Sequence, residues 1–153
     1  MNSLESKTAL LFPGQGSQYA GMAKSFYEQE ESTRQLFDTI ECGFDIKDLC
    51  FDGPEDMLRE TRYSQASIFM ASIATANALR DKGLKVDAVA GLSLGEYAAL
   101  CYADSFSVQD GVNLLVDRGR IMADFIPENS GMAVILALDP EVVQAYCDEA
   151  SQP

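Results

Sequence analysis

The chain has 153 residues, 47% of them hydrophobic and 23% charged, which suits one ordinary globular domain with a core of its own. Its 24 acidic and 11 basic side chains give a formal charge of -13, which opposes binding to nucleic acid or to an anionic membrane surface, so neither partner is expected. The four cysteines have no metal-ligand spacing and the chain has no histidine, which argues against a zinc site and a disulfide framework.

Neither a targeting segment nor a membrane span is expected. Residues Met1 to Lys7 lack the positively charged start and apolar stretch of a secretory signal. The longest apolar run, Ala66 to Leu79, is diluted by Ser, Thr and Asn and is too short to cross a bilayer. We therefore expect a cytoplasmic protein with free thiols.

The first third of the chain is predicted to hold one strand followed by helices. The strand, Thr8 to Phe12, ends at a glycine-rich turn, Pro13 to Gln18, and a helix is expected to begin near Gly21. The Gly-x-Gly in this turn is not a dinucleotide-binding motif, because Tyr19 occupies the position of the third glycine. Further helices are expected at Ser32–Ile40, Asp45–Cys50, Pro54–Thr61 and Ser64–Lys82. The last helix is predicted to pack against the sheet; its Gln65 is either functional or, as is commoner, a polar residue at the core edge.

A buried strand, a sharp turn and a helix then follow one another without a loop. The strand is Val86–Ala90, the turn Gly91–Gly95 reads Gly-Leu-Ser-Leu-Gly, and Glu96–Ala103 is predicted to be helical. A serine on so tight a turn takes a strained backbone that lifts its hydroxyl clear of the sheet, and the following N–H, on Leu94, can stabilise an oxyanion. Ser93 is therefore a candidate nucleophile, and a helix N-cap is its alternative role.

An arginine on the next predicted helix is a candidate for anion binding. The helix starts at a capping box, Ser107–Asp110, and runs to about Ile126. At about 100° per residue, Arg118 lies roughly 60° from the centre of the apolar face, so it points partly inward. A partly buried guanidinium needs an anionic partner, which is either a carboxylate of the protein or a carboxylate or phosphate of a ligand.

The last predicted elements suggest a second structural unit. Pro127–Gly131 is a turn cluster, and Met132–Leu138 is predicted to be a strand. Asp139 is predicted to cap a helix that runs to Ala150.

Four stretches of the chain resemble one family in order and in spacing. They are Leu11–Gln18, Gly91–Tyr97, Val116–Met122 and Gly131–Ala133. They are similar to the malonyl-CoA:acyl carrier protein transacylases of fatty acid synthesis and to the related acyltransferase domains of polyketide synthases. The resemblance implies an α/β fold, with the N-terminal part of an α/β-hydrolase-like subdomain with a parallel sheet at residues 1–126. It also implies the start of a small ferredoxin-like subdomain at residues 127–153.

The resemblance also implies roles for individual residues. It makes Ser93 the nucleophile that takes the acyl group from coenzyme A, and it makes the backbone N–H groups of Gln15 and Leu94 the oxyanion hole. It assigns Arg118 to the carboxylate of the malonyl group. The implied substrates are malonyl-CoA and the phosphopantetheine thiol of acyl carrier protein, with no cofactor and no metal.

The departures from the family concern two side chains and the length of the chain. Leu92 stands where a histidine is common and Ala66 where a proline is common, and neither position supplies the catalytic base. The family's chains are longer and carry the catalytic histidine in their second half, so this chain resembles a fragment that is predicted to be inactive alone. A serine esterase with the same turn and a non-catalytic acyltransferase-like scaffold or binding protein remain the alternatives.

Overall fold

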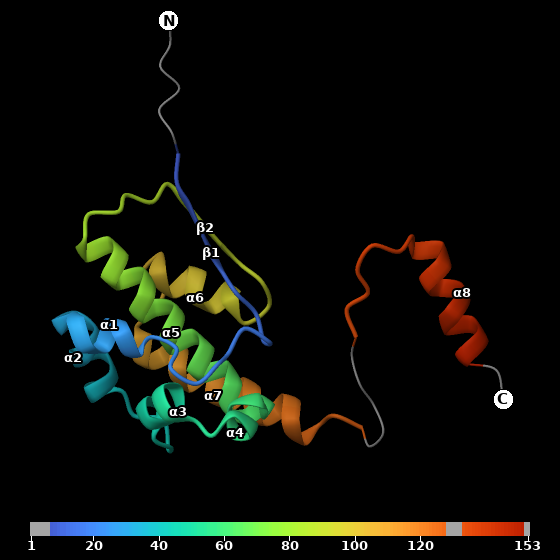
Figure 1. Cartoon of the computed structure of the whole chain (residues 1–153), viewed down its shortest axis with the longest axis horizontal. Coiled ribbons are helices and arrows are strands. Elements are labelled where there is room, and N and C mark those ends of the chain that lie inside the picture. The colour runs from blue at the N-terminus through green and yellow to red at the C-terminus, as the bar shows by residue number, and fades with distance from the viewer. Residues whose placement is uncertain (1–6, 128–132, 152–153) are drawn as a thin grey trace, which may run out of the picture.

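A computed structural model gives the structure of the chain and describes residues 7–127 and 133–151. Its elements, in chain order, are β1 (Ala9–Phe12), α1 (Lys24–Gln29), α2 (Glu31–Thr39), α3 (Ile46–Asp52), α4 (Glu55–Arg59), α5 (Thr61–Asp81), β2 (Ala88–Gly91), α6 (Gly95–Tyr102), α7 (Val108–Asp124) and α8 (Pro140–Ala150) (Figure 1). The predicted α/β class is confirmed.

The two strands form a small parallel sheet. Ala9 pairs with Ala88, and Phe12 pairs with Gly91. Parallel strands need a long crossover connection, and here α1 to α5 lie between the two strands in the sequence. Helix α6 contacts both strands. The parallel sheet expected from the sequence is therefore present in the described residues.

Helix α5 is the centre of the helical layer. It contacts α1 to α4, α6 and α7, and it runs through the middle of the helical part in Figure 1. Its buried apolar side chains supply much of the core: Ala66, Ile68, Phe69, Met70, Ile73, Ala74, Ala76 and Ala78. Burial of side chains as large as Phe or Ile stabilises the fold by about 1.5–3 kcal/mol each. The helix is a buried packing helix, as the sequence predicts, but its main contacts are with the other helices and not with the sheet against which it is predicted to pack.

Two glycines let α7 approach α5 closely. A Cβ atom at Gly111 would lie 2.4 Å from Cζ of Phe69, and one at Gly119 would lie 2.8 Å from the carbonyl oxygen of Thr61. Real Cβ atoms do not come so close to other atoms, so any side chain at these positions would push the helices apart. The N-cap half of the predicted capping box is confirmed, because the Asp110 N–H donates to Ser107 Oγ at 3.1 Å, while the Asp110 carboxylate accepts from the Ser107 hydroxyl.

Several helix boundaries differ from the sequence expectation by a few residues. Helix α1 begins at Lys24 rather than near Gly21, because the chain first turns through positive φ at Gly21 (99°) and Ala23 (64°). Pro54 precedes α4 instead of occupying its first turn, and Glu60, in extended conformation, separates α4 from α5.

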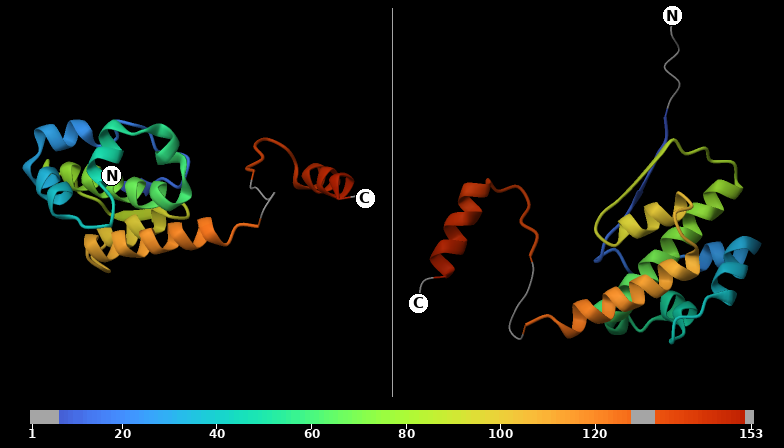
Figure 2. Two further views of the ribbon diagram at one scale, coloured as in Figure 1. Left: turned by 90° about the horizontal axis from the view of Figure 1, so that it is seen from below. Right: turned by 180° about the vertical axis from the view of Figure 1, so that it is seen from behind.

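The predicted strand Met132–Leu138 is wrong for the residues that the structure describes. Residues 133–138 form no strand, because a strand needs a hydrogen-bonded partner and the described residues provide none there. Met132, and the turn residues 128–131, lie outside the described residues. The helix expected after Asp139 is confirmed as α8, which lies apart from the other helices in Figures 1 and 2 and has no buried residue.

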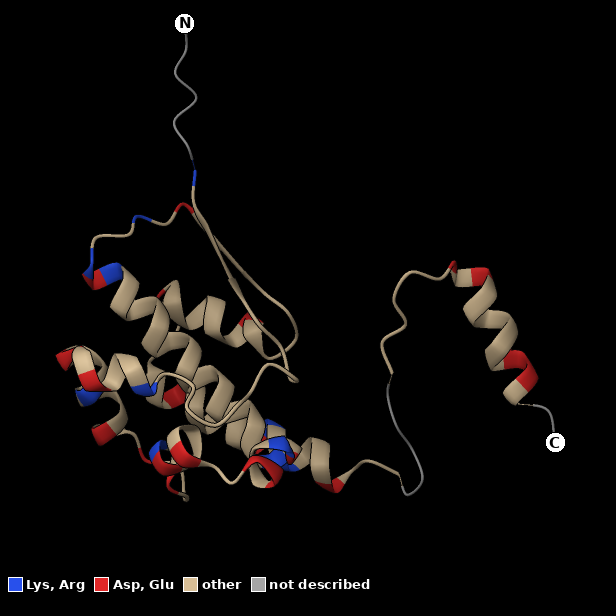
Figure 3. Cartoon of the chain, viewed as in Figure 1, with Lys and Arg blue, Asp and Glu red and all other residues tan. Residues whose placement is uncertain are grey.

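Charged side chains are spread unevenly over the chain. Figure 3 shows acidic residues on α8 and neither Lys nor Arg there. The basic side chains lie instead among the earlier elements, where most of them pair with carboxylates. Across residues 7–127 and 133–151, no helix combines the length and the hydropathy that a bilayer span requires.

The cysteines should differ sharply in reactivity. All four are free, and burial raises the pKa of the Cys50 thiol to about 12 and that of Cys101 to about 11. Because the thiolate is the reacting form, a raised pKa lowers the reactive fraction at pH 8.

We expect iodoacetamide at pH 8 to alkylate the exposed Cys147 at once and Cys50 only after unfolding, as measured by peptide mass spectrometry. Equal rates at Cys50 and Cys147 without denaturant would contradict this expectation.

Candidate active site

Ser93 lies in the turn that joins β2 to α6. Its φ angle of 54° is in the left-handed region, which costs a non-glycine residue about 1–2 kcal/mol. Ser93 is exposed, whereas Leu94, the next residue, is fully buried. This is the strained strand-to-helix turn that the sequence predicts, with the serine at its tip.

The glycines on either side of Ser93 are required by close backbone contacts. A Cβ atom at Gly91 would lie 2.0 Å from the carbonyl carbon of Gly95. A Cβ atom at Gly95 would lie 2.3 Å from the carbonyl oxygen of Phe12. The turn therefore closes on itself and on the end of β1 only because both positions lack a side chain.

The glycine-rich turn after β1 lies beside Ser93. The Leu92 N–H donates to the Phe12 carbonyl at 3.0 Å, and a Cβ atom at Gly14 would be 3.0 Å from the Leu92 carbonyl oxygen. The Gln15 side chain points to the start of α5, where its amide nitrogen donates to Thr61 Oγ1 at 3.1 Å. In the two described ranges, the N–H groups of Gln15 and Leu94 donate no hydrogen bond, so both are available to an acceptor.

Arg118 reaches from α7 to the serine. Its Nη2 donates to Ser93 Oγ at 3.1 Å, and its Nη1 donates to Gln65 Oε1. Its guanidinium carbon lies 5.7 Å from the centre of the Tyr97 ring, a favourable cation–π distance. Arg118 is partly buried, as the helical spacing predicts. The structure thus brings together Ser93 and Arg118, which are 25 residues apart in the sequence.

Arg118 differs from most other arginines in the partner it has. Arg59, Arg62 and Arg120 form ion pairs with carboxylates of the chain, as Arg34 does with Glu31. Arg118 forms no ion pair with any carboxylate in the part of the chain that the structure describes. The structural ion pair that the sequence left as an alternative for Arg118 is therefore not present among the described residues.

The sequence leaves Gln65 as either a functional residue or a polar residue at the core edge, and the structure places it in contact with Arg118. Its side chain is fully buried, its Oε1 accepts from Arg118, and its Nε2 lies 3.1 Å from the sulfur of Met122. A glutamine near the start of a helix with a largely apolar buried face is itself a signal, because a buried amide must have hydrogen-bond partners. The sequence alone does not show which partners these are.

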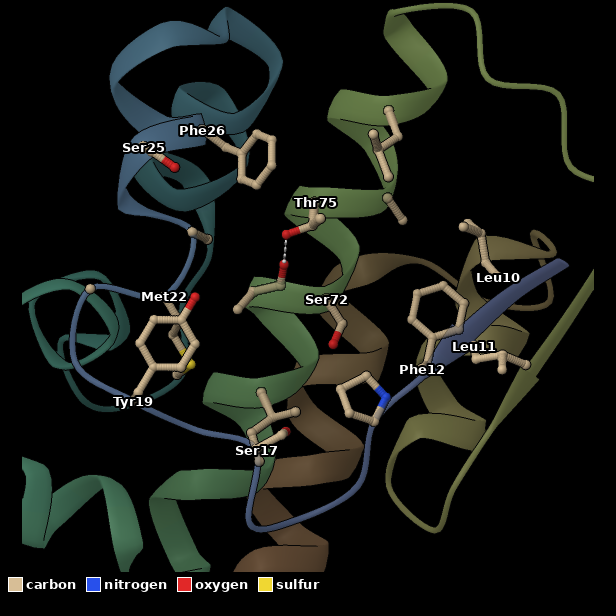
Figure 4. Close-up of a pocket in the computed structure, with 17 residues that line it drawn as sticks. Leu10, Leu11, Phe12, Ser17, Tyr19, Met22, Ser25, Phe26, Ser72 and Thr75 are labelled. Atoms are coloured by element: carbon tan, nitrogen blue, oxygen red, sulfur yellow. Dashed lines mark hydrogen bonds between the residues drawn. The ribbon is translucent and has the colours of Figure 1, made fainter. Parts of the chain in front are cut away.

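A separate cavity of about 430 Å³ lies between β1, α1 and α5. Figure 4 shows Leu10 from the strand, Phe26 from α1 and Ser72 from α5 around it. Its lining is mostly apolar and includes neither Ser93 nor Arg118. The serine and the arginine therefore form a site outside this cavity.

Comparison with known proteins decides the family. The profile of the acyl transferase domain matches residues 9–151 of the chain. The chain belongs to the acyl transferase domain family. The resemblance inferred from the four sequence stretches is thereby confirmed.

The relatives of this acyl transferase domain are named as malonyl transferases. The malonyl CoA-acyl carrier protein transacylase of Bacillus subtilis (strain 168) is 38% identical over 150 residues, which are 96% of this chain and 47% of the relative. The crystal structure of the corresponding transacylase from Clostridium perfringens has a TM-score of 0.85 at 36% identity, covering 95% of this chain and 47% of that one.

A third relative is a malonyl-transacylase in complex with its type II polyketide synthase acyl-carrier protein. It has a TM-score of 0.86 and 35% identity, and the match covers 96% of this chain and 49% of that one. The chain therefore spans about half the length of the relatives it matches. Within that half, the two structural matches cover 95–96% of this chain.

Substitution of a glycine beside the serine should destabilise the acyl transferase domain. We expect Gly91→Ala to lower the free energy of unfolding by about 3 kcal/mol or more, because its Cβ would overlap the backbone of Gly95. Gly43→Ala is the control: Gly43 also has positive φ, at 81°, but open space around it, so only the backbone cost of about 1 kcal/mol applies. Urea denaturation measures both, and equal losses would contradict the overlap.

Proposed function

We propose that this protein transfers the malonyl group from malonyl-CoA to the phosphopantetheine thiol of acyl carrier protein in fatty acid biosynthesis. The observation that carries the proposal is the contact between Arg118 and Ser93, which puts a cation that has no carboxylate partner among the described residues beside an exposed hydroxyl on a strained turn. The names of the relatives point to the same reaction. The donor is thus a coenzyme A thioester, and the reaction needs no cofactor and no metal.

The reaction has two steps with Ser93 as the carrier. In the first, Ser93 Oγ attacks the thioester carbonyl, the C–S bond breaks, and coenzyme A leaves as the thiol, with the proton lost by Ser93. In the second, the phosphopantetheine thiol attacks the malonyl ester, the bond to Oγ breaks, and the proton of the thiol returns to Ser93. Because the malonyl group is first held on Ser93, its transfer from one bulky substrate to the other takes place in two separate steps.

Two backbone groups are proposed to stabilise the oxyanion of each step. The N–H groups of Gln15 and Leu94 both lack an acceptor within the described residues, and close contacts join the turns that carry them. Leu94 also lies at the N-terminus of α6, where the helix dipole favours negative charge. Removal of one such donor from an enzyme typically costs on the order of 3 kcal/mol in the transition state.

Arg118 is proposed to select the acyl group. A malonyl group ends in a carboxylate, which accepts two parallel hydrogen bonds from a guanidinium. An acetyl group ends in a methyl group, which neither accepts a hydrogen bond nor carries a charge that could pair with Arg118. A partly buried cation without a partner is unfavourable, so the arginine discriminates between the two thioesters by the contact that acetyl lacks. A serine esterase for neutral esters would have no use for this cation.

The chain has no histidine, so we propose that the histidine base implied by the family resemblance is not supplied by these 153 residues. We propose that residues 1–126 form the N-terminal part of an α/β-hydrolase-like subdomain of a cytoplasmic enzyme, and that 127–153 begin a ferredoxin-like one. The 153-residue polypeptide alone then transfers malonyl groups at least about 10⁴-fold more slowly than an enzyme with its base. A non-catalytic scaffold would show no acylation of Ser93 at all.

Slow acylation of Ser93 tests the nucleophile. The chain incubated for hours with radiolabelled malonyl-CoA should accumulate label on Ser93, and Ser93→Ala should remove at least about nine-tenths of it. Ser72→Ala is the control, because Ser72 lines the separate cavity and should not change labelling. Label that persists at wild-type level in Ser93→Ala would reject Ser93 as the nucleophile.

Substitution of the arginine tests selectivity. We expect Arg118→Met to lower the ratio of malonyl to acetyl labelling by about tenfold or more, since a hydrogen bond to a charged group contributes about 1.5–3 kcal/mol. Arg80→Met is the matched control, because Arg80 also donates to a side-chain amide, that of Asn77, but lies away from Ser93. An unchanged ratio in Arg118→Met would mean that the arginine does not read the acyl group.

A further inference from the structure

We infer that Gln65 is a positioning residue whose neutral, buried amide holds Arg118 beside Ser93 and leaves the positive charge of Arg118 for the carboxylate of the acyl group. The inference rests on the proposed malonyl transfer and adds the residue that keeps the selecting cation both fixed and uncompensated. Gln65 itself touches no reacting atom, and it acts through Arg118.

The hydrogen bonds of Gln65 fix the orientation of its amide. The guanidinium of Arg118 only donates hydrogen bonds, so the atom of Gln65 that faces it must be the oxygen. The amide nitrogen then faces the sulfur of Met122 at 3.1 Å, which is a weak acceptor. Gln65 is fully buried, so no water competes for either side of the amide.

The packing of α7 on α5 brings the three side chains together. Arg118 and Met122 are four residues apart on α7, so they lie on the same face of that helix. Gly119 lies between them and packs against the backbone of Thr61 and Arg62 at the start of α5. Because Gly119 has no side chain, α7 lies close enough to α5 for the Gln65 amide to reach the guanidinium.

The neutral charge of the amide distinguishes this contact from an ion pair. A carboxylate at residue 65 would pair with Arg118 inside the protein and compensate its charge before any substrate arrived. The amide accepts one hydrogen bond from Nη1 and adds no charge. Nη2 donates to the hydroxyl of Ser93, which is neutral as well. The substrate carboxylate is then the first anion that the guanidinium meets, provided that Arg118 stays in place.

Gln65 variants separate positioning from simple core packing. Gln65→Glu keeps the shape and adds a charge, whereas Gln65→Leu keeps the volume approximately and removes the hydrogen bond. Asn77→Asp is the matched control, because it makes the same amide-to-acid change on the same helix next to another arginine, Arg80. Thermal unfolding of each variant checks that it folds.

The first measurement follows the guanidinium and needs no activity. In the NMR spectrum of the 153-residue chain, the Nε–Hε signal of Arg118, assigned by its loss in Arg118→Lys, should report a rigid side chain. Gln65→Leu should reduce its order parameter to that of the exposed Arg120, while Gln65→Glu and Asn77→Asp should leave it rigid. A rigid Arg118 in folded Gln65→Leu would overturn the positioning role.

The second measurement compares the binding of malonyl-CoA and acetyl-CoA by calorimetry, in a Ser93→Ala background that prevents acylation. The chain with Gln65 should prefer malonyl-CoA, and Gln65→Glu should reduce that preference at least tenfold while Asn77→Asp keeps it. A preference that survives in Gln65→Glu would overturn the inference that a neutral partner is needed. Absence of any preference with Gln65 present would instead reject the proposed malonyl selectivity, and the NMR measurement would then decide the positioning role by itself.

Discussion

The approach of the β2–α6 turn to the end of β1 is the constraint on which the candidate site depends. It is possible because Gly95 has no side chain where the carbonyl oxygen of Phe12 lies, and because Gly91 leaves room for the backbone of Gly95. The same closure puts Ser93 at positive φ and exposes its hydroxyl. A small strain in one residue is maintained by the packing of its neighbours, which is how strained functional turns persist in stable proteins.

A second close approach, between α5 and α7, supplies the cation. Gly111 and Gly119 allow the two helices to pack with little space between them, and Arg118 then extends from α7 over the turn that carries the serine. The charge is surrounded by neutral groups, namely the Gln65 amide, the Ser93 hydroxyl and the Tyr97 ring. Such surroundings orient a guanidinium without compensating it, which suits a group whose anionic partner is a ligand.

The features that the sequence predicted well are local ones. The tight turn at Ser93 was predicted from the glycine spacing, and the partial burial of Arg118 from the helical period. Both features depend only on residues within a few positions in the sequence. The contact of Arg118 with Gln65 was missed because it joins residues 53 positions apart through helix packing. The strand expected up to Leu138 was wrong in its described part because apolar, β-branched residues favour a strand only where another strand pairs with it.

The two-stranded sheet has a consequence for how the protein behaves at high concentration. Within the described residues, β1 and β2 each have a single neighbour, so each strand leaves one row of backbone groups without a ladder partner. Leu11 on β1 is 78% exposed and Leu92 after β2 is 72% exposed, which adds apolar surface beside those rows. Any strand that is added to the sheet must pair at one of these two edges. Strands of neighbouring copies can pair at the same edges, so correct assembly competes with aggregation there.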